Sequence, residues 1–148
     1  MPMFKDVLIV CHANICRSPM AEAMFKADAK VRAAGIVVHS AGLFAKPGRE
    51  ADATVKSILL ERDVDVGEHR SRLLTGDMIG SAQLILVMED EQVKEIVRRE
   101  PISRGKVHLL GKWNNVEIND PYKQAEAVYK DCAALVEQSV ANWIKKIC

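Results

Sequence analysis

Four short, mostly apolar runs alternate with longer segments whose apolar residues recur every three or four positions. The runs lie at 7–10, 36–39, 84–88 and 107–110. A run of this length and composition is typical of a strand covered on both faces. The longer segments, which their periodicity predicts to be helices, lie at 18–35, 52–62, 90–99 and 126–146. Strands that alternate with helices in this way predict an α/β sandwich around a parallel sheet.

Helix boundaries are indicated by residues that cap or interrupt helices. Ser18-Pro19 predicts a helix start, because proline is favoured at the first helical position. The helical spacing continues through Val31, and Gly35 ends it. Asp90 is expected to cap a later helix that Pro101 terminates.

Composition and charge exclude several classes of protein. No repeat, low-complexity stretch or linker interrupts the 148 residues, so we expect one domain over 1–148. The net charge of +1 argues against nucleic-acid binding and against a polybasic membrane patch. No apolar run is long enough to insert into a membrane, and residues 1–6 lack the apolar core of a signal peptide, so a cytoplasmic protein is expected.

The cysteines and histidines do not form a metal-binding pattern. The four cysteines at 11, 16, 132 and 148 contain no Cys-x-x-Cys pair, and the four histidines are scattered. A chain that is long enough for a full core and has no export signal is expected to keep its cysteines as thiols. We therefore expect neither a metal site nor another cofactor.

The loop 11–18 joins the first predicted strand to a helix start, where ligands of parallel sheets bind. Backbone N–H groups in such a loop, together with the helix dipole, bind an anion. In that field a cysteine at position 11 is favoured as thiolate, a nucleophile. Arg17 offers a planar fork for two phosphate oxygens, and Ser18 can donate its hydroxyl to the thiolate. In the alternative interpretation, Cys11 is a buried strand-end residue and Arg17 a surface charge.

Loop 111–125 follows the fourth predicted strand and is expected at the same edge of the sheet. Expulsion of an alkoxide or phenoxide by a cysteine nucleophile needs a proton from a nearby acid. Asp120, in Asn119-Asp120-Pro121-Tyr122, is the best candidate. Taken alone, Asp-Pro is more often a plain turn.

Cys-x5-Arg-Ser-Pro, Ser40-Ala41-Gly42 and Asp-Pro-Tyr at 120 together resemble the low-molecular-weight protein-tyrosine-phosphatases, bacterial type, across essentially the whole chain. The resemblance implies one three-layer α/β domain, with a four-stranded parallel sheet flanked by helices on both faces. It implies two-step hydrolysis of phosphotyrosine without metal or cofactor. Cys11 is then the nucleophile, Arg17 binds phosphate, and Asp120 is first the acid and then the base.

The resemblance also implies roles for residues around the loop. Residues matching Asn14, Ser18, Ser40 and His69 support it through hydrogen bonds, although Ser40 as a plain strand end and His69 as an ordinary histidine remain open. The phosphate- and substrate-binding residues are His12, Ala13, Asn14, Ile15, Cys16, Arg17, Ser18, Phe44 and Tyr122. Phe44 and Tyr122 are expected to form an aromatic wall at the cleft edge, whereas Trp113 and Trp143 are expected to pack structurally.

Two positions depart from the family pattern. Ala13 stands where the family usually has glycine, so a positive φ there would strain the loop. Tyr122 is followed by Lys123, where many members carry a second aromatic residue. Substrate preference is therefore less strongly implied than the chemistry.

Rival functions are separated by single features. Thioredoxin-coupled arsenate reduction is rejected, because residues 60–131 contain no cysteine. A protein-arginine phosphatase of the same fold carries threonine where Ile15 stands. A non-catalytic phosphate-binding or redox module is the third interpretation.

Cys16, in the same loop as Cys11, is a candidate redox partner for Cys11; in the alternative it is only a small buried side chain. The segment Leu43-Phe44-Ala45 resembles bacterial members that are paired with tyrosine autokinases of polysaccharide export. A phosphotyrosine-containing protein, in particular such a kinase, is the partner that this resemblance implies.

Overall fold

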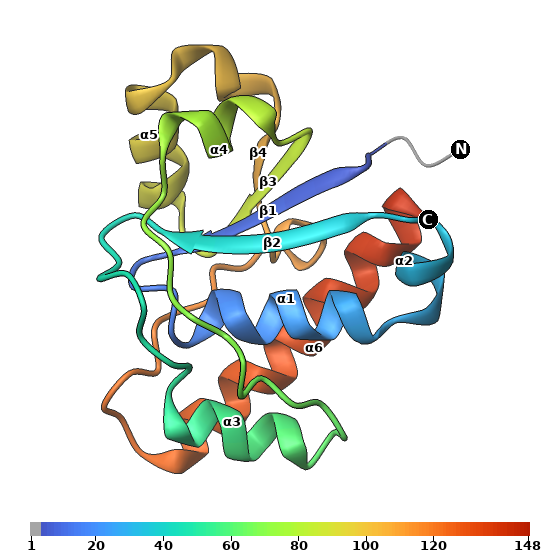
Figure 1. Cartoon of the computed structure of the whole chain (residues 1–148), viewed down its shortest axis with the longest axis vertical. Helices are drawn as coiled ribbons and strands as arrows, with labels where there is room; N and C mark the ends of the chain where they lie inside the picture. The colour runs from blue at the N-terminus through green and yellow to red at the C-terminus, as the bar shows by residue number, and fades with distance from the viewer. Residues whose placement is uncertain (1–3) are drawn as a thin grey trace.

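The computed structural model describes residues 4–148, so residues 1–3 of the segment assessed above for a signal peptide lie outside it. Its centre is a parallel sheet of four strands in the order β2-β1-β3-β4 (Figure 1). The strands are β1 (Asp6–Cys11), β2 (Val37–Gly42), β3 (Leu84–Val87) and β4 (Val107–Leu109). The predicted parallel sheet is confirmed.

Helices cover both faces of this sheet (Figure 1). They are α1 (Arg17–Ala27), α2 (Ala29–Ala33), α3 (Ala53–Leu60), α4 (Gly76–Ser81), α5 (Asp90–Arg99) and α6 (Glu126–Ile147), with 3₁₀ turns at Pro101–Gly105 and Lys112–Asn114. Helices α1, α3 and α6 lie on one face of the sheet, and α4 and α5 lie on the other. The three-layer prediction is therefore confirmed.

The apolar run of β1 fills both halves of the core, because successive strand residues point to opposite faces. Val7 and Ile9 pack with the side chains of α1, α3 and α6. Leu8 and Val10 pack with those of α4 and α5. All four are fully buried. Complete burial of a valine, leucine or isoleucine side chain stabilises a fold by roughly 1.5–3 kcal/mol, so β1 is anchored from both sides.

The helix predicted over 18–35 is two helices. It begins at Arg17, so Pro19 is the third helical residue and not the first. It ends at Ala27, because Asp28 takes an extended conformation and its carboxylate accepts hydrogen bonds from Lys30 N and Val31 N. An aspartate cap of this kind satisfies backbone donors that would otherwise lack partners at the start of α2.

The predicted boundaries of other elements also change. Glu89, not Asp90, caps α5, through a reciprocal pair of hydrogen bonds with Gln92 that forms a capping box. Asp52 is the cap of α3 and not its first residue. β2 starts one residue later than predicted and continues to Gly42, whereas β3 and β4 each end one residue early. The six-residue α4, which contains two glycines, was not predicted.

The strand order places one crevice at the carboxyl edge of the sheet. The chain crosses from β1 to β2 on one side and from β3 to β4 on the other, so the loops after β1 and β3 diverge. In open parallel sheets ligands bind at such a switch point.

Of the helices within residues 4–148, none has the length and apolar character needed to cross a membrane.

Candidate active site

The segment 11–17 forms a tight loop between the end of β1 and the first turn of α1. Gly42 allows this loop to lie against β2, because a Cβ there would be only 2.7 Å from the carbonyl oxygen of His12. Beyond Gly42, Leu43 N donates to Cys11 O and Phe44 N to His12 O, each at 2.9 Å. This close approach is the physical reason for glycine in the Ser-Ala-Gly motif.

A cavity of about 300 Å³ opens above the loop. It is lined by Cys11, His12, Ala13, Ile15, Cys16, Arg17, Phe44, Lys46, Arg49, Asp120 and Tyr122. The structure thus brings the predicted nucleophile, arginine and acid into one cavity. The side chains of Asn14 and Ser18, predicted among the phosphate-binding residues, are fully buried and do not line the cavity. Lys46 and Arg49 were missed in the sequence, where nothing separates them from ordinary surface charges.

Asn14 carries the unusual backbone conformation of the loop. Its φ is 60°, in the left-handed region that asparagine tolerates better than most residues. Ala13 is not among the residues with positive φ. The condition under which Ala13 would strain the loop is therefore not met, since the positive φ belongs to the next residue.

A chain of hydrogen bonds fixes the direction of the Ser18 proton. Ser40 donates its hydroxyl to Glu22 Oε1, and the Asn14 amide donates to Ser40 Oγ at 2.9 Å and to Ser18 Oγ at 2.7 Å. Since Ser18 Oγ accepts from Asn14, its own proton is available for Cys11 Sγ, 2.9 Å away. The backbone N–H of Asn14 also donates to Cys11 Sγ, at 3.3 Å. Both donors favour a negative charge on this sulfur.

Two further contacts hold Asn14 from the side of β2. His69 Nε2 lies 2.8 Å from Asn14 O, so this nitrogen carries the proton and donates it. The Arg72 N–H donates to Asn14 Oδ1 at 2.9 Å. The contacts expected of Asn14, Ser18, Ser40 and His69 are all present, and Glu22 and Arg72 are additions that the sequence did not indicate.

Arg17 is 2% exposed and is held by groups from two other loops. Its Nη1 donates to Glu89 Oε1 at 2.5 Å and to Ile118 O at 2.8 Å. Burial alone would lower the pKa of Arg17, but the negative charges of Cys11, Glu89 and Asp120 outweigh it and raise this pKa. Nε has no hydrogen-bond partner within residues 4–148. This charged side chain therefore keeps donor capacity for an anion above Cys11.

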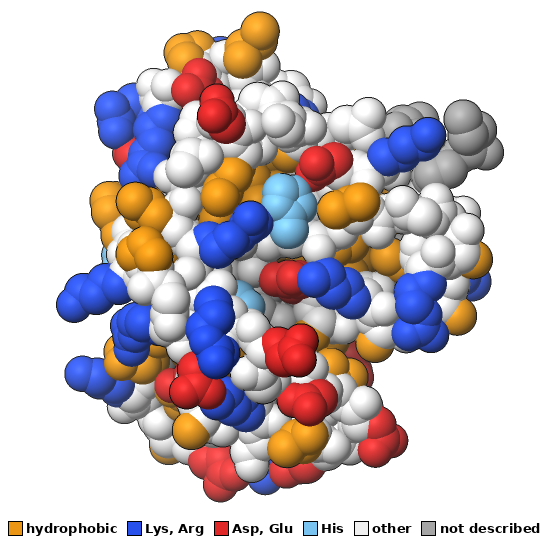
Figure 2. Space-filling view, in the orientation of Figure 1, with side chains coloured by type: hydrophobic (Ala, Val, Ile, Leu, Met, Phe, Trp, Pro, Cys, Tyr) orange, Lys and Arg blue, Asp and Glu red, His pale blue; other side chains and the backbone are white. Residues whose placement is uncertain are grey.

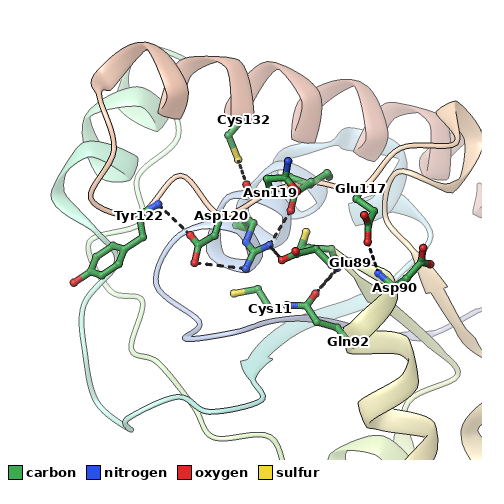
Figure 3. Close-up of polar contacts among 12 residues, drawn as sticks. Cys11, Glu89, Asp90, Gln92, Glu117, Asn119, Asp120, Tyr122 and Cys132 are labelled. Atoms are coloured by element: carbon green, nitrogen blue, oxygen red, sulfur yellow. Dashed lines mark hydrogen bonds and ion pairs between the residues drawn. The ribbon is translucent and has the colours of Figure 1, made fainter.

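Asp120 enters the cavity from the loop after β4. Its Oδ2 lies 3.7 Å from Arg17 Nη2, and its Oδ1 accepts from Tyr122 N at 3.1 Å. Ile118 N donates to Met88 O at 2.9 Å, which ties this loop to the end of β3. Figure 3 shows Cys11, Glu89 and Asp120 gathered at one place from three loops.

Glu89 was not predicted as a site residue, although it follows the buried strand β3 at the same sheet edge as Cys11. Only the loops after the first and fourth strands were expected to contribute to the site. Replacing Glu89 with glutamine removes the carboxylate that anchors Arg17 Nη1. We expect phosphate affinity and kcat/KM to fall about 10–100-fold, because a small misplacement of a binding group costs this much.

Inhibition constants for inorganic phosphate and steady-state rates measure this effect. Glu91→Gln is the matched control, because Glu91 lies two residues away and forms an exposed ion pair with Lys94. Equal small losses in both variants would contradict an anchoring role for Glu89.

The aromatic residues predicted at the rim lie there. Phe44 is 59% exposed, with the His12 ring 5.2 Å from its centroid and the Arg99 guanidinium 5.5 Å from it. Tyr122 also lines the cavity and is 38% exposed. Trp143 is buried and donates to Leu110 O at 2.9 Å, so its predicted structural packing is confirmed.

Comparison with known proteins supports one family over the whole fold. Residues 6–148 match the family model described as low molecular weight phosphotyrosine protein phosphatase. The probable low molecular weight protein-tyrosine-phosphatase EpsP of Ralstonia solanacearum is 37% identical over 98% of this chain and 97% of its own.

Solved structures are also similar over nearly the whole chain, and two of them show the range of activities. The tyrosine phosphatase AmsI of Erwinia amylovora has a TM-score of 0.91 and 36% identity, covering 98% of this chain and 94% of its own. The arginine phosphatase YwlE of Geobacillus stearothermophilus has a TM-score of 0.87 and 31% identity, covering 95% and 91%. The family model and these relatives agree with the motifs and with the loop geometry, so the chain belongs to the low molecular weight protein-tyrosine-phosphatase family.

Proposed function

We propose that this protein hydrolyses phosphotyrosine in proteins through a phosphate ester of Cys11. The observation that carries the proposal is the meeting of Cys11, Arg17 and Asp120 around one cavity, with two donors directed at the Cys11 sulfur. A bound phosphate would take the N–H groups of the loop and the free donors of Arg17. A thiolate below the phosphorus and an acid above it are the two groups that the reaction needs.

In the first step the Cys11 thiolate attacks phosphorus and the bond from phosphorus to the tyrosyl oxygen breaks. Protonated Asp120 gives its proton to that oxygen, so tyrosine leaves as a neutral phenol. Arg17 stabilises the charge on the equatorial oxygens of the transition state. A covalent phosphocysteine and an Asp120 carboxylate remain.

In the second step the Asp120 carboxylate takes a proton from water as the water oxygen attacks phosphorus. The sulfur–phosphorus bond breaks and inorganic phosphate is released. Ser18 donates a hydrogen bond to the departing sulfur, because Asn14 has already fixed the direction of its proton. Each group returns to its starting protonation state.

The depth of the cavity and Ile15 favour phosphotyrosine over other phosphorylated residues. Phe44, Tyr122 and Cys11 line one cavity, so we expect a flat aryl ring to lie against the two aromatic side chains while its phosphate reaches Cys11. Phosphoserine is too short, because its backbone meets the rim first. Phosphoarginine has the reach, so the apolar Ile15 separates it from phosphotyrosine. Because the chain is similar in structure to an arginine phosphatase, the comparison of phosphotyrosine with phosphoarginine tests the proposal most sharply.

Matched phosphotyrosyl and phosphoarginyl peptides test this preference. We expect a higher kcat/KM for phosphotyrosine in the wild type and a shift toward phosphoarginine in Ile15→Thr, because a hydroxyl adds a polar contact for the guanidinium. Ile36→Thr, in another part of the core, is the control for loss of stability. A wild-type preference for phosphoarginine would place the protein in the other branch of the fold.

We propose that Cys16 protects Cys11 during oxidation. Peroxide converts the Cys11 thiolate to a sulfenic acid, and the Cys16 thiol condenses with it to a disulfide and water. Cys16 lines the same cavity as Cys11. Burial together with the negative charge of Asp52 raises its pKa, so Cys16 is a thiol that must lose its proton as it attacks the Cys11 sulfur. We expect activity to return with thiol more fully in the wild type than in Cys16→Ser, because without Cys16 the sulfenic acid is left open to irreversible oxidation to a sulfinic acid. Peptide mapping after mild peroxide checks the bond, and full recovery of the variant would refute the role.

We propose that the partner is a phosphotyrosine-containing protein in the cytoplasm, in particular a bacterial tyrosine kinase. Relatives of this chain are named as protein-tyrosine-phosphatases, which supports a phosphoprotein as the substrate. Figure 2 shows lysine and arginine side chains along the left edge of this face, and basic and acidic side chains mixed over the rest of it. A binding-competent, inactive Cys11→Ser protein should retain such a kinase from a lysate of the source cells. Retention that phosphotyrosine or vanadate does not compete away would contradict this partner.

A further inference from the structure

Tyr129 lies behind the loop that carries Asp120, in the first turn of α6. Its side chain belongs to the apolar core and is 4% exposed. Its hydroxyl does not line the active-site cavity. The oxygen accepts a hydrogen bond from Lys123 N at 3.1 Å and donates one to Asp52 Oδ2 at 3.2 Å. A core tyrosine thus has a polar end that touches two separate segments.

Asp52 connects this hydroxyl to the phosphate-binding loop. Its backbone N–H donates to Ile15 O at 2.9 Å. Its other carboxylate oxygen accepts from Thr54 N at 2.9 Å and caps α3. Asp52 is therefore fixed on one side by the loop around Cys11 and on another by a helix, which makes it a firm support for the Tyr129 hydroxyl.

Lys123 belongs to the turn that sets the position of Asp120. Gln124 N donates to Pro121 O at 2.9 Å, which closes a four-residue turn with Lys123 at its third position. The φ of Lys123 is 62°, a conformation for which turns of this kind prefer glycine. A residue held in this way keeps its conformation only when surrounding contacts fix it. The Tyr129 hydroxyl is such a contact.

We infer that Tyr129 is a positioning residue that holds the Asp120 carboxyl above Cys11 by linking Lys123 of the acid loop to Asp52 beside the phosphate loop. The inference rests on the proposed role of Asp120 as the proton donor. Burial raises the pKa of Tyr129 to about 12, so its proton stays available to Asp52 throughout the working range of the enzyme. Cys132 supports the same loop from the next turn of α6, where its thiol reaches Asn119 O (Figure 3).

Tyr129→Phe tests the inference, because it keeps the ring in the core and removes both hydrogen bonds. We expect kcat/KM for phosphotyrosine, which reports the first step alone, to fall about 10-fold, as for a misplaced catalytic group. The loss should shrink for aryl phosphates whose leaving groups have a low pKa, since these depart without a proton. The inhibition constant for inorganic phosphate should not change, because Cys11 and Arg17 are untouched.

Val140→Ala is the matched control for simple destabilisation, since Val140 is a buried residue of α6 that contacts neither loop through a hydrogen bond. It should lower Tm, and any loss of rate relative to the wild type should be the same for every leaving group. The same flat loss in Tyr129→Phe would overturn the inference and leave Tyr129 a structural residue.

A double-mutant cycle with Asp120→Asn separates this inference from the role of Asp120 itself. If Tyr129 acts through Asp120, Tyr129→Phe has no further effect on the rate in the Asp120→Asn protein. An equal loss in both backgrounds would overturn the inference. If Asp120→Asn alone shows no dependence on the leaving group, the proposed acid is wrong, whatever Tyr129 does.

Discussion

Cys11→Ser is expected to reduce turnover to the uncatalysed background while the protein still binds phosphate and vanadate. Serine is far less acidic than cysteine, so the N–H of Asn14 and the Ser18 hydroxyl, which support a negative sulfur, cannot produce an alkoxide. The anion cradle is separate from the nucleophile, because it consists of loop N–H groups and Arg17. Binding should therefore change little.

Steady-state rates on an aryl phosphate, with vanadate binding followed in parallel, measure both parts of this prediction. Cys148→Ser is the matched control, because Cys148 is an exposed free cysteine at the end of the chain. It should retain wild-type activity. Substantial turnover in Cys11→Ser would exclude the sulfur as the nucleophile.

Asp120→Asn is expected to lower the rate on phosphotyrosine by about 10²–10⁴-fold, the usual contribution of a general acid. Asparagine keeps the shape of the aspartate side chain, and its amide oxygen can still accept the hydrogen bond from Tyr122 N, so the loop should hold its position. The loss should become small for leaving groups of low pKa, which need no proton. A plot of log kcat/KM against leaving-group pKa should be steeper in the variant than in the wild type.

The control for this series is Asp131→Asn, an exposed aspartate on α6. It should reproduce the wild-type slope. Parallel slopes for the wild type and Asp120→Asn would mean that Asp120 orders its loop and donates no proton.

The strands could be predicted because each is buried on both faces and so needs an uninterrupted apolar run. The first loop could be predicted because nucleophile, cradle and arginine are adjacent in the sequence. Asp120 could be predicted from the rule that the loops after parallel strands meet at one edge of the sheet. The same rule would have placed Glu89 at this edge. A glutamate at the start of a helix is, however, already explained as a helix cap, and Glu89 does cap α5.

Features that depend on distant contacts could not be predicted. The link from Tyr129 to Asp52 joins residues that are 77 positions apart, and no local pattern indicates it. The break at Asp28 depends on whether a side-chain cap stabilises the chain more than a continued helix, a balance of about 1 kcal/mol. The positive φ considered for Ala13 is found at Asn14, because a family difference at one position does not show which residue of the loop has the positive φ.

The covalent intermediate is the most direct test of the account. Asp120→Asn also slows the attack of water, so a good aryl phosphate should load the enzyme faster than water unloads it. Rapid acid quenching followed by peptide mass mapping should find one phosphoryl group on Cys11 in this variant and none in Cys11→Ser. A phosphoryl group on His12, or rapid turnover with no covalent phosphate at any time, would contradict the account.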